Sequence, residues 1–129
     1  MKETIYTIPI NEAFDANTEC PFCFIQDKLE SDSVEYTIGA VMAPEYRMES
    51  NKKGFCSKHF SMLYAIPNKL SLALLLDTHL THLRELVDSR LQVKSVMFGG
   101  INHSQYASLI HGTLDACLIC EKTESDMKR

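Results

Sequence analysis

The amino-acid sequence predicts an all-α fold: a small helical domain in which a Cys₃His metal site joins two helix N-termini. Three observations support this prediction. An apolar stripe at helical period runs through residues 69–92, short cysteine and histidine pairs stand where helices are expected to start, and strand signals are weak throughout. With 129 residues and no low-complexity linker, the chain is expected to form one domain over residues 1–129.

Composition and charge narrow the classes of function. The apolar content of 45% is ordinary for a globular protein, and the net charge of −4 does not favour binding to nucleic acid. The local candidates for a basic patch are Arg47, Lys52, Lys53 and Lys58, which more often form a solvated loop. Nucleic-acid binding therefore stays a minor alternative.

The sequence predicts a cytoplasmic protein without a membrane segment. The N-terminus lacks the apolar region of a secretory signal, and the run from Leu70 to Leu76 is too short to span a bilayer. Thiols stay reduced in the cytoplasm, and an odd number of cysteines in paired spacings favours metal binding over disulfides.

The first half of the chain is expected to begin with an irregular segment. Residues 1–19 contain Pro9 and a polar stretch, so the sequence predicts an extended or irregular lead-in. A helix is expected to start at Pro21 and to end before Pro44. Residues 46–51 are predicted to form only a short helical turn.

The second half is expected to contain the longest helix. A helix should run from near Cys56 to Pro67, followed by one over residues 69–92. The apolar stripe of the long helix consists of Leu72, Leu76, His79, Leu83 and Leu86.

The C-terminal third is harder to assign. Gly99 and Gly100 should break the chain, and residues 103–114 are ambiguous. A last helix is expected to begin at Cys117.

Two of the pairs make a complete ligand set for zinc. Cys20 is expected at an N-cap with Cys23 three residues later, and Cys56 and His59 have the same spacing. Ligands three residues apart at a helix start lie on one face, where backbone N–H groups favour thiolates. The sequence predicts a closed structural site, zinc in preference to iron, at Cys20, Cys23, Cys56 and His59. The alternative is two buried thiol pairs without a metal.

Cys117 and Cys120 repeat the spacing without an obvious partner. The first metal module is expected over residues 1–95, and residues 103–129 would start a second, incomplete module. Three alternatives are open for this second half-site: ligands from His103 and His111, a site shared by two copies in a homodimer through Cys117/Cys120, or a free pair.

Two enzymatic alternatives compete with a structural metal. The Cys20–Cys23 segment, CPFC, also matches a thiol-disulfide redox motif, although a hydrophobic strand should precede it and none is expected here. His79 and His82 could hold a metal with Asp77 or Glu85, but the position of His79 on the apolar stripe favours a buried histidine.

With these motifs in view, the chain resembles an uncharacterised bacterial family of unknown function. The matching segments are IYTIPINEAF, CPFC, NKKGFCSKHFSML, LSLALLLDTHLTHL and CLIC, which span nearly the whole chain. The resemblance implies longer relatives in which a second CxxC is followed by a second GFCxxH. It places Cys20, Cys23, Cys56 and His59 in a first module and Cys117 and Cys120 at the start of a second, whose Cys-x-x-His is not in this sequence.

The sequence thus favours a zinc-stabilised cytoplasmic module that binds an unidentified protein partner. It favours a non-enzymatic role over a redox or metal-dependent enzyme, and it identifies no biological process.

Overall fold

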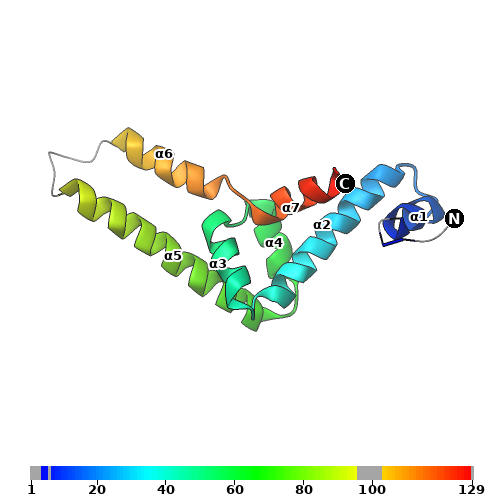
Figure 1. Cartoon of the computed structure of the whole chain (residues 1–129), viewed down its shortest axis with the longest axis horizontal. Coiled ribbons are helices and arrows are strands. Elements are labelled where there is room, and N and C mark those ends of the chain that lie inside the picture. The colour runs from blue at the N-terminus through cyan, green and yellow to red at the C-terminus, as the bar shows by residue number, and fades with distance from the viewer. Residues whose placement is uncertain (1–3, 6, 96–102, 129) are drawn as a thin grey trace.

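The computed structural model describes residues 4–5, 7–95 and 103–128, and in this part of the chain every regular element is a helix (Figure 1). The all-α prediction is confirmed. The helices are α1 (Ile8–Asp15), α2 (Pro21–Ala40), α3 (Pro44–Lys53), α4 (Ser57–Ala65), α5 (Lys69–Ser95), α6 (His103–Leu114) and α7 (Leu118–Met127).

The expectation of an extended or irregular lead-in over residues 1–19 is wrong for Ile8–Asp15, which form α1. Pro9 lies in the first turn of this helix, where a proline is tolerated since the N–H that it lacks would have no partner within the helix. The fully buried Ala13 is part of α1, which packs against α2.

Proline starts a helix at two further places. Pro21 is the first residue of α2, as predicted, with Cys20 as its N-cap. Pro44 is the first residue of α3, so the predicted turn at residues 46–51 is part of a longer helix. The hydroxyls of Thr37 and Tyr46 lie 2.8 Å apart and connect the end of α2 to α3.

The later helices match the periodicity of the sequence. The predicted helix over residues 69–92 is α5, and the ambiguous residues 103–114 form α6. The helix expected from near Cys56 is α4, which ends before Pro67, and the helix expected at Cys117 is α7. The predicted break at Gly99 and Gly100 lies outside the described residues. Within those residues, none of the helices combines the length and the apolar character that crossing a membrane needs.

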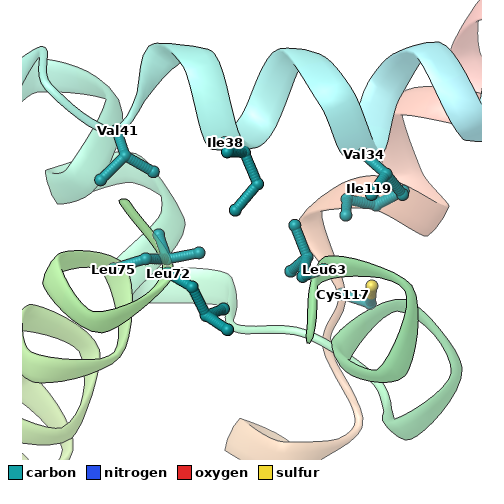
Figure 2. Packing of buried hydrophobic residues seen from close by; sticks show 8 residues of the cluster. All are labelled: Val34, Ile38, Val41, Leu63, Leu72, Leu75, Cys117 and Ile119. Atoms are coloured by element: carbon teal, nitrogen blue, oxygen red, sulfur yellow. The ribbon is translucent and has the colours of Figure 1, made fainter. Parts of the chain in front are cut away.

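The hydrophobic core lies where α2, α4, α5 and α7 converge (Figure 2). Leu63 of α4 and Leu75 of α5 are fully buried, and Ile119 of α7 is almost so. Cys117, which was predicted as part of a possible second half-site, belongs to this core. The buried cluster consists of Val34, Ile38, Val41, Leu63, Leu72, Leu75, Cys117 and Ile119.

Helices α2 and α7 pack side by side in antiparallel directions (Figure 1). Lys122 in α7 places its Nζ 3.7 Å from the ring centroid of Tyr36, which is near the C-terminal end of α2. At the other end of the pair, Gln26 of α2 and Met127 of α7 line the same pocket. The two helix starts, at Cys20 and Cys117, therefore lie at opposite ends of this pair.

Candidate metal centre

Three cysteines and one histidine from two helix starts come together at one edge of the core. Cys56 is the N-cap of α4 and His59 lies in its first turn, while Cys117 is the N-cap of α7 and Cys120 lies in its first turn. Their four ligand atoms all lie within 4.8 Å of one another. The predicted Cys₃His group joining two helix N-termini is therefore present.

The size of the cluster fits a tetrahedral zinc ion. His59 Nδ1 lies 3.2 Å from the Sγ of Cys56 and 3.3 Å from the Sγ atoms of Cys117 and Cys120. The Sγ atoms of Cys56 and Cys120 are 3.9 Å apart, far beyond a disulfide bond of about 2.05 Å. Zinc bonds of about 2.3 Å to sulfur and about 2.0 Å to nitrogen would place these ligand atoms about 3.5–3.8 Å apart. Only a small adjustment would accommodate an ion.

The imidazole of His59 is fixed by Glu30 of α2. Its Nε2 lies 2.7 Å from Glu30 Oε1, and the ring is buried, with only 2% of the residue exposed. Donation from Nε2–H to the carboxylate leaves the lone pair of Nδ1 facing the three sulfurs, which is the tautomer that a metal requires. Lys58 Nζ lies 2.6 and 2.8 Å from the two oxygens of Glu30 and balances its charge.

Glu30 was not among the predicted site residues. A single carboxylate within a helix carries no local signal, and its contact with His59 exists only because α4 packs against α2. The approach of these two helices thus supplies an orienting group for the histidine.

A backbone contact also joins the two halves of the cluster. The N–H of Leu118 donates to the carbonyl of Gly54 at 3.1 Å. Gly54 has φ 71° and ψ −160°, a conformation that is essentially restricted to glycine. A Cβ at this position would lie 3.0 Å from His79 Cε1, so both the turn and its packing require a glycine.

The thiols influence one another's protonation. Burial acts to raise the pKa of Cys56, but hydrogen bonds from the backbone of His59 and Lys58 and from the other two thiols bring it below its ordinary value. Burial and the neighbouring sulfurs of Cys117 and Cys56 raise the pKa of Cys120 to about 12. A divalent cation among the sulfurs would offset this repulsion and favour three thiolates.

The structure groups the predicted ligands differently from the expected set of Cys20, Cys23, Cys56 and His59. Cys20 and Cys23 form a disulfide with each other, and the place expected for them beside Cys56 and His59 is taken by Cys117 and Cys120. The physical reason is distance along α2.

His59 meets α2 at Glu30, which lies about 15 Å along a helix from Cys20 at 1.5 Å per residue. The chain passes through the short helix α3 and reaches α4 beside the middle of α2. Cys56 and His59 therefore lie far from Cys20 and Cys23 at the start of α2. Among the described residues, the half-site at Cys117 and Cys120 lies beside Cys56 and His59, and His111, one of the alternative ligands, is not part of this group. The exposed His111 lies on α6, and the side chain of His103 lies outside the described part of the chain.

The other candidate residues lie apart from this cluster. His79 packs edge-on against Phe55, with ring centroids 6.5 Å apart, and burial and the nearby His82 lower its pKa. In the described ranges, no group of three or more ligating side chains includes His79 or His82.

The candidate basic residues have local partners in three of four cases. Lys53 pairs with Glu121, Lys58 pairs with Glu30, and Arg47 donates to the carbonyl of Val41 at 2.6 Å, while Lys52 is exposed.

Comparison with known proteins identifies a family but no activity. The model of a family of unknown function, DUF6062, matches residues 1–129. No curated protein and no solved structure matches the chain. The residues of the site therefore carry the functional argument.

Proposed function

The chain belongs to the family of unknown function DUF6062, and we propose that it is a zinc-stabilised helical module that acts by binding another protein in the cytoplasm. The observation that carries the proposal is the cluster of Cys56, His59, Cys117 and Cys120, whose ligand atoms lie within 4.8 Å of one another.

The donor set favours zinc. Three sulfurs and one imidazole nitrogen are typical of structural zinc sites, and thiolates select against magnesium and calcium. The hydrogen bond between His59 and Glu30 resembles the carboxylate–histidine pairs that orient zinc ligands. Iron is the less favoured alternative for the same donors.

A structural role follows from the number of protein ligands. A catalytic zinc keeps one position for water or substrate, whereas four protein ligands would close the coordination sphere. The metal would join α4 to α7, whose starts are far apart in the sequence but adjacent in the fold. Binding energy at such a site contributes to folding energy.

Exposed apolar side chains support a role in binding. Phe14 of α1 is 62% exposed and Phe22 of α2 is 68% exposed, and Ile5 nearby in the sequence is 84% exposed. Contiguous exposed apolar side chains are typical of surfaces that bind other proteins, and these three residues are candidates for such a surface. A reduced cytoplasm would keep the thiolates available for zinc.

Elemental analysis combined with thermal unfolding tests the zinc assignment. Protein purified without added metal should contain at least one zinc ion per chain, and a strong chelator should lower its melting temperature. Zinc restored to the chelated protein should recover the original value. Full stability in a protein that contains no zinc would contradict the proposal.

A further inference from the structure

The pair Cys20 and Cys23 has the same spacing and a similar N-cap backbone conformation to the pair Cys117 and Cys120 of the metal cluster. Cys20 is the N-cap of α2 with φ −134° and ψ 92°, and Cys117 is the N-cap of α7 with φ −143° and ψ 118°. Each is followed by a second cysteine in the first turn of its helix. The backbone N–H of Cys23 donates to Cys20 Sγ at 3.2 Å. The two helix starts thus share their cysteine spacing and an extended N-cap backbone, while Cys20 and Cys23 form a disulfide and Cys117 and Cys120 are free thiols.

The antiparallel packing of α2 and α7 separates these two arrangements. At the start of α7, Cys56 and His59 of α4 complete a group of four ligands. At the start of α2, the neighbouring element is α1, whose sequence contains no cysteine or histidine. Across the described ranges, no third ligating side chain gathers around Cys20 and Cys23. This arrangement therefore has half of the ligands that a closed site needs.

We propose that Cys20 and Cys23 are a second zinc half-site, completed by the same pair from a second copy of the chain. Two identical pairs related by a twofold axis supply four thiolates in a tetrahedral arrangement, and such an axis is the commonest symmetry of homodimers. The ligand atoms of Cys56 and His59 lie within 4.8 Å of those of Cys117 and Cys120, so an ion bound there would leave neither of them to complete the pair at Cys20.

The surface around Cys20 suits contact with a second copy. Cys23 is exposed, and Cys20 is partly exposed. Phe22 lies between them in the sequence and is 68% exposed, and Phe14 at the end of α1 is 62% exposed. Contact between two copies at this end would remove apolar surface from water, which favours association.

Zinc can bind here only after the disulfide is reduced. Two molecules of a thiol reductant transfer two electrons and two protons to the Cys20–Cys23 bond, and they are oxidised to one disulfide. Each cysteine then loses its proton when its sulfur binds the ion, so four protons leave for every zinc that joins two chains. The N-terminus of α2 favours these thiolates, because its dipole and free N–H groups stabilise negative charge.

The test compares the full chain with its Cys20→Ser/Cys23→Ser variant, each supplied with zinc under a phosphine reductant. The reduced wild-type chain should sediment as a dimer and contain one and a half zinc ions per chain. The variant should be a monomer with one zinc ion per chain. Because Cys23 is exposed and Cys20 partly so, this variant is expected to fold, and its helical circular dichroism checks that it does.

The two proposals fail in distinguishable ways, since this inference rests on the proposed function only for the identity of the metal. Zinc that remains in the variant is bound at the cluster that includes Cys56. Zinc that the substitutions remove was bound at the second site. A reduced wild-type chain that stays monomeric with one zinc ion would overturn the second site, whether the pair remains a disulfide or a free dithiol. A variant that dimerises as strongly as the wild type would also overturn it.

Discussion

Glu30 accepts a hydrogen bond from His59 on the side of the imidazole opposite the three sulfurs, with Oε1 2.7 Å from Nε2. The contact fixes both the orientation of the ring and the nitrogen that can bind a metal. It also links α2 to the cluster formed by the starts of α4 and α7. Three helices that are distant in the sequence thus converge on one imidazole.

Replacing Glu30 should weaken metal binding without removing a ligand. In Glu30→Gln, the side chain no longer carries the charge that enhances the basicity of His59, so the affinity for zinc should fall ~10–100-fold. Competition with a chromophoric chelator measures the change. Glu12→Gln is a matched control, because it removes a comparable ion pair with Lys28 outside the cluster. An unchanged affinity in Glu30→Gln would show that the carboxylate does not orient the ligand.

The ion pair of Glu30 also predicts a dependence of stability on pH. Lys58 lowers the pKa of Glu30, partial burial opposes this effect, and the hydrogen bond with His59 adds to it, so the pKa lies below its ordinary value of 4.5. A carboxyl group with a lower pKa in the folded state stabilises the fold above the unfolded-state pKa, and this stabilisation is lost as the pH falls through the folded-state value.

The stability advantage of the wild type over Glu30→Gln should therefore be full near neutral pH and should shrink as the pH falls below about 4.5. Urea unfolding of both zinc-free proteins over a series of pH values measures this difference without a contribution from zinc release. A difference that grows towards acid pH would have the opposite sign and would rule out the ion pair as its source.

Gly54→Ala should destabilise the turn that leads into Cys56. The positive φ and the 3.0 Å approach of a Cβ to His79 Cε1 together predict a loss of roughly 1–3 kcal/mol in the free energy of unfolding. Gly39→Ala is the control, because Gly39 lies in α2 and an added Cβ there would meet open space. Gly39→Ala should raise the free energy of unfolding by roughly 0.5–1 kcal/mol, because alanine has a higher helix propensity than glycine. Equal changes at the two glycines, measured by denaturant unfolding, would contradict the structure.

Leu63→Ala should be among the most damaging substitutions in the core. Leu63 of α4 is fully buried in the core cluster with residues of α2, α5 and α7, so its truncation should cost about 2–5 kcal/mol. Leu80→Ala tests the same change at a residue that is 61% exposed and should alter stability by no more than about 0.5 kcal/mol. Denaturant unfolding measures both values, and similar losses would show that the core lies elsewhere.

The sequence was sufficient for the local features of the site. The N-cap position of Cys20 followed from Pro21, which favours a helix start, and helices were expected to start near Cys56 and at Cys117, where the structure has α4 and α7. The long helix over Lys69–Ser95 followed from its apolar period. Pro9 misled the prediction for the N-terminus, since proline in a first turn is as compatible with a helix as with an extended segment.

The pairing of the half-sites depends on packing that the local sequence does not encode. Cys20-x-x-Cys23 and Cys117-x-x-Cys120 are equivalent as helix starts, and Cys56 is closer in sequence to the first pair. Two contacts determine which pair lies beside Cys56 and His59. They are the antiparallel packing of α2 against α7 and the contact of α4 with α2 at Glu30. These contacts join residues far apart in the chain, so spacing alone cannot reveal them.

The zinc content of Cys117→Ser, compared with that of Cys20→Ser, tests the assignment of the central site most directly. Both substitutions remove the N-cap thiol of a two-cysteine helix start, so they differ in position rather than in chemistry. We predict that Cys117→Ser loses the zinc bound with Cys56 and His59, while Cys20→Ser retains one zinc ion per chain. Loss of this zinc from Cys20→Ser, with full retention by Cys117→Ser, would contradict the assignment.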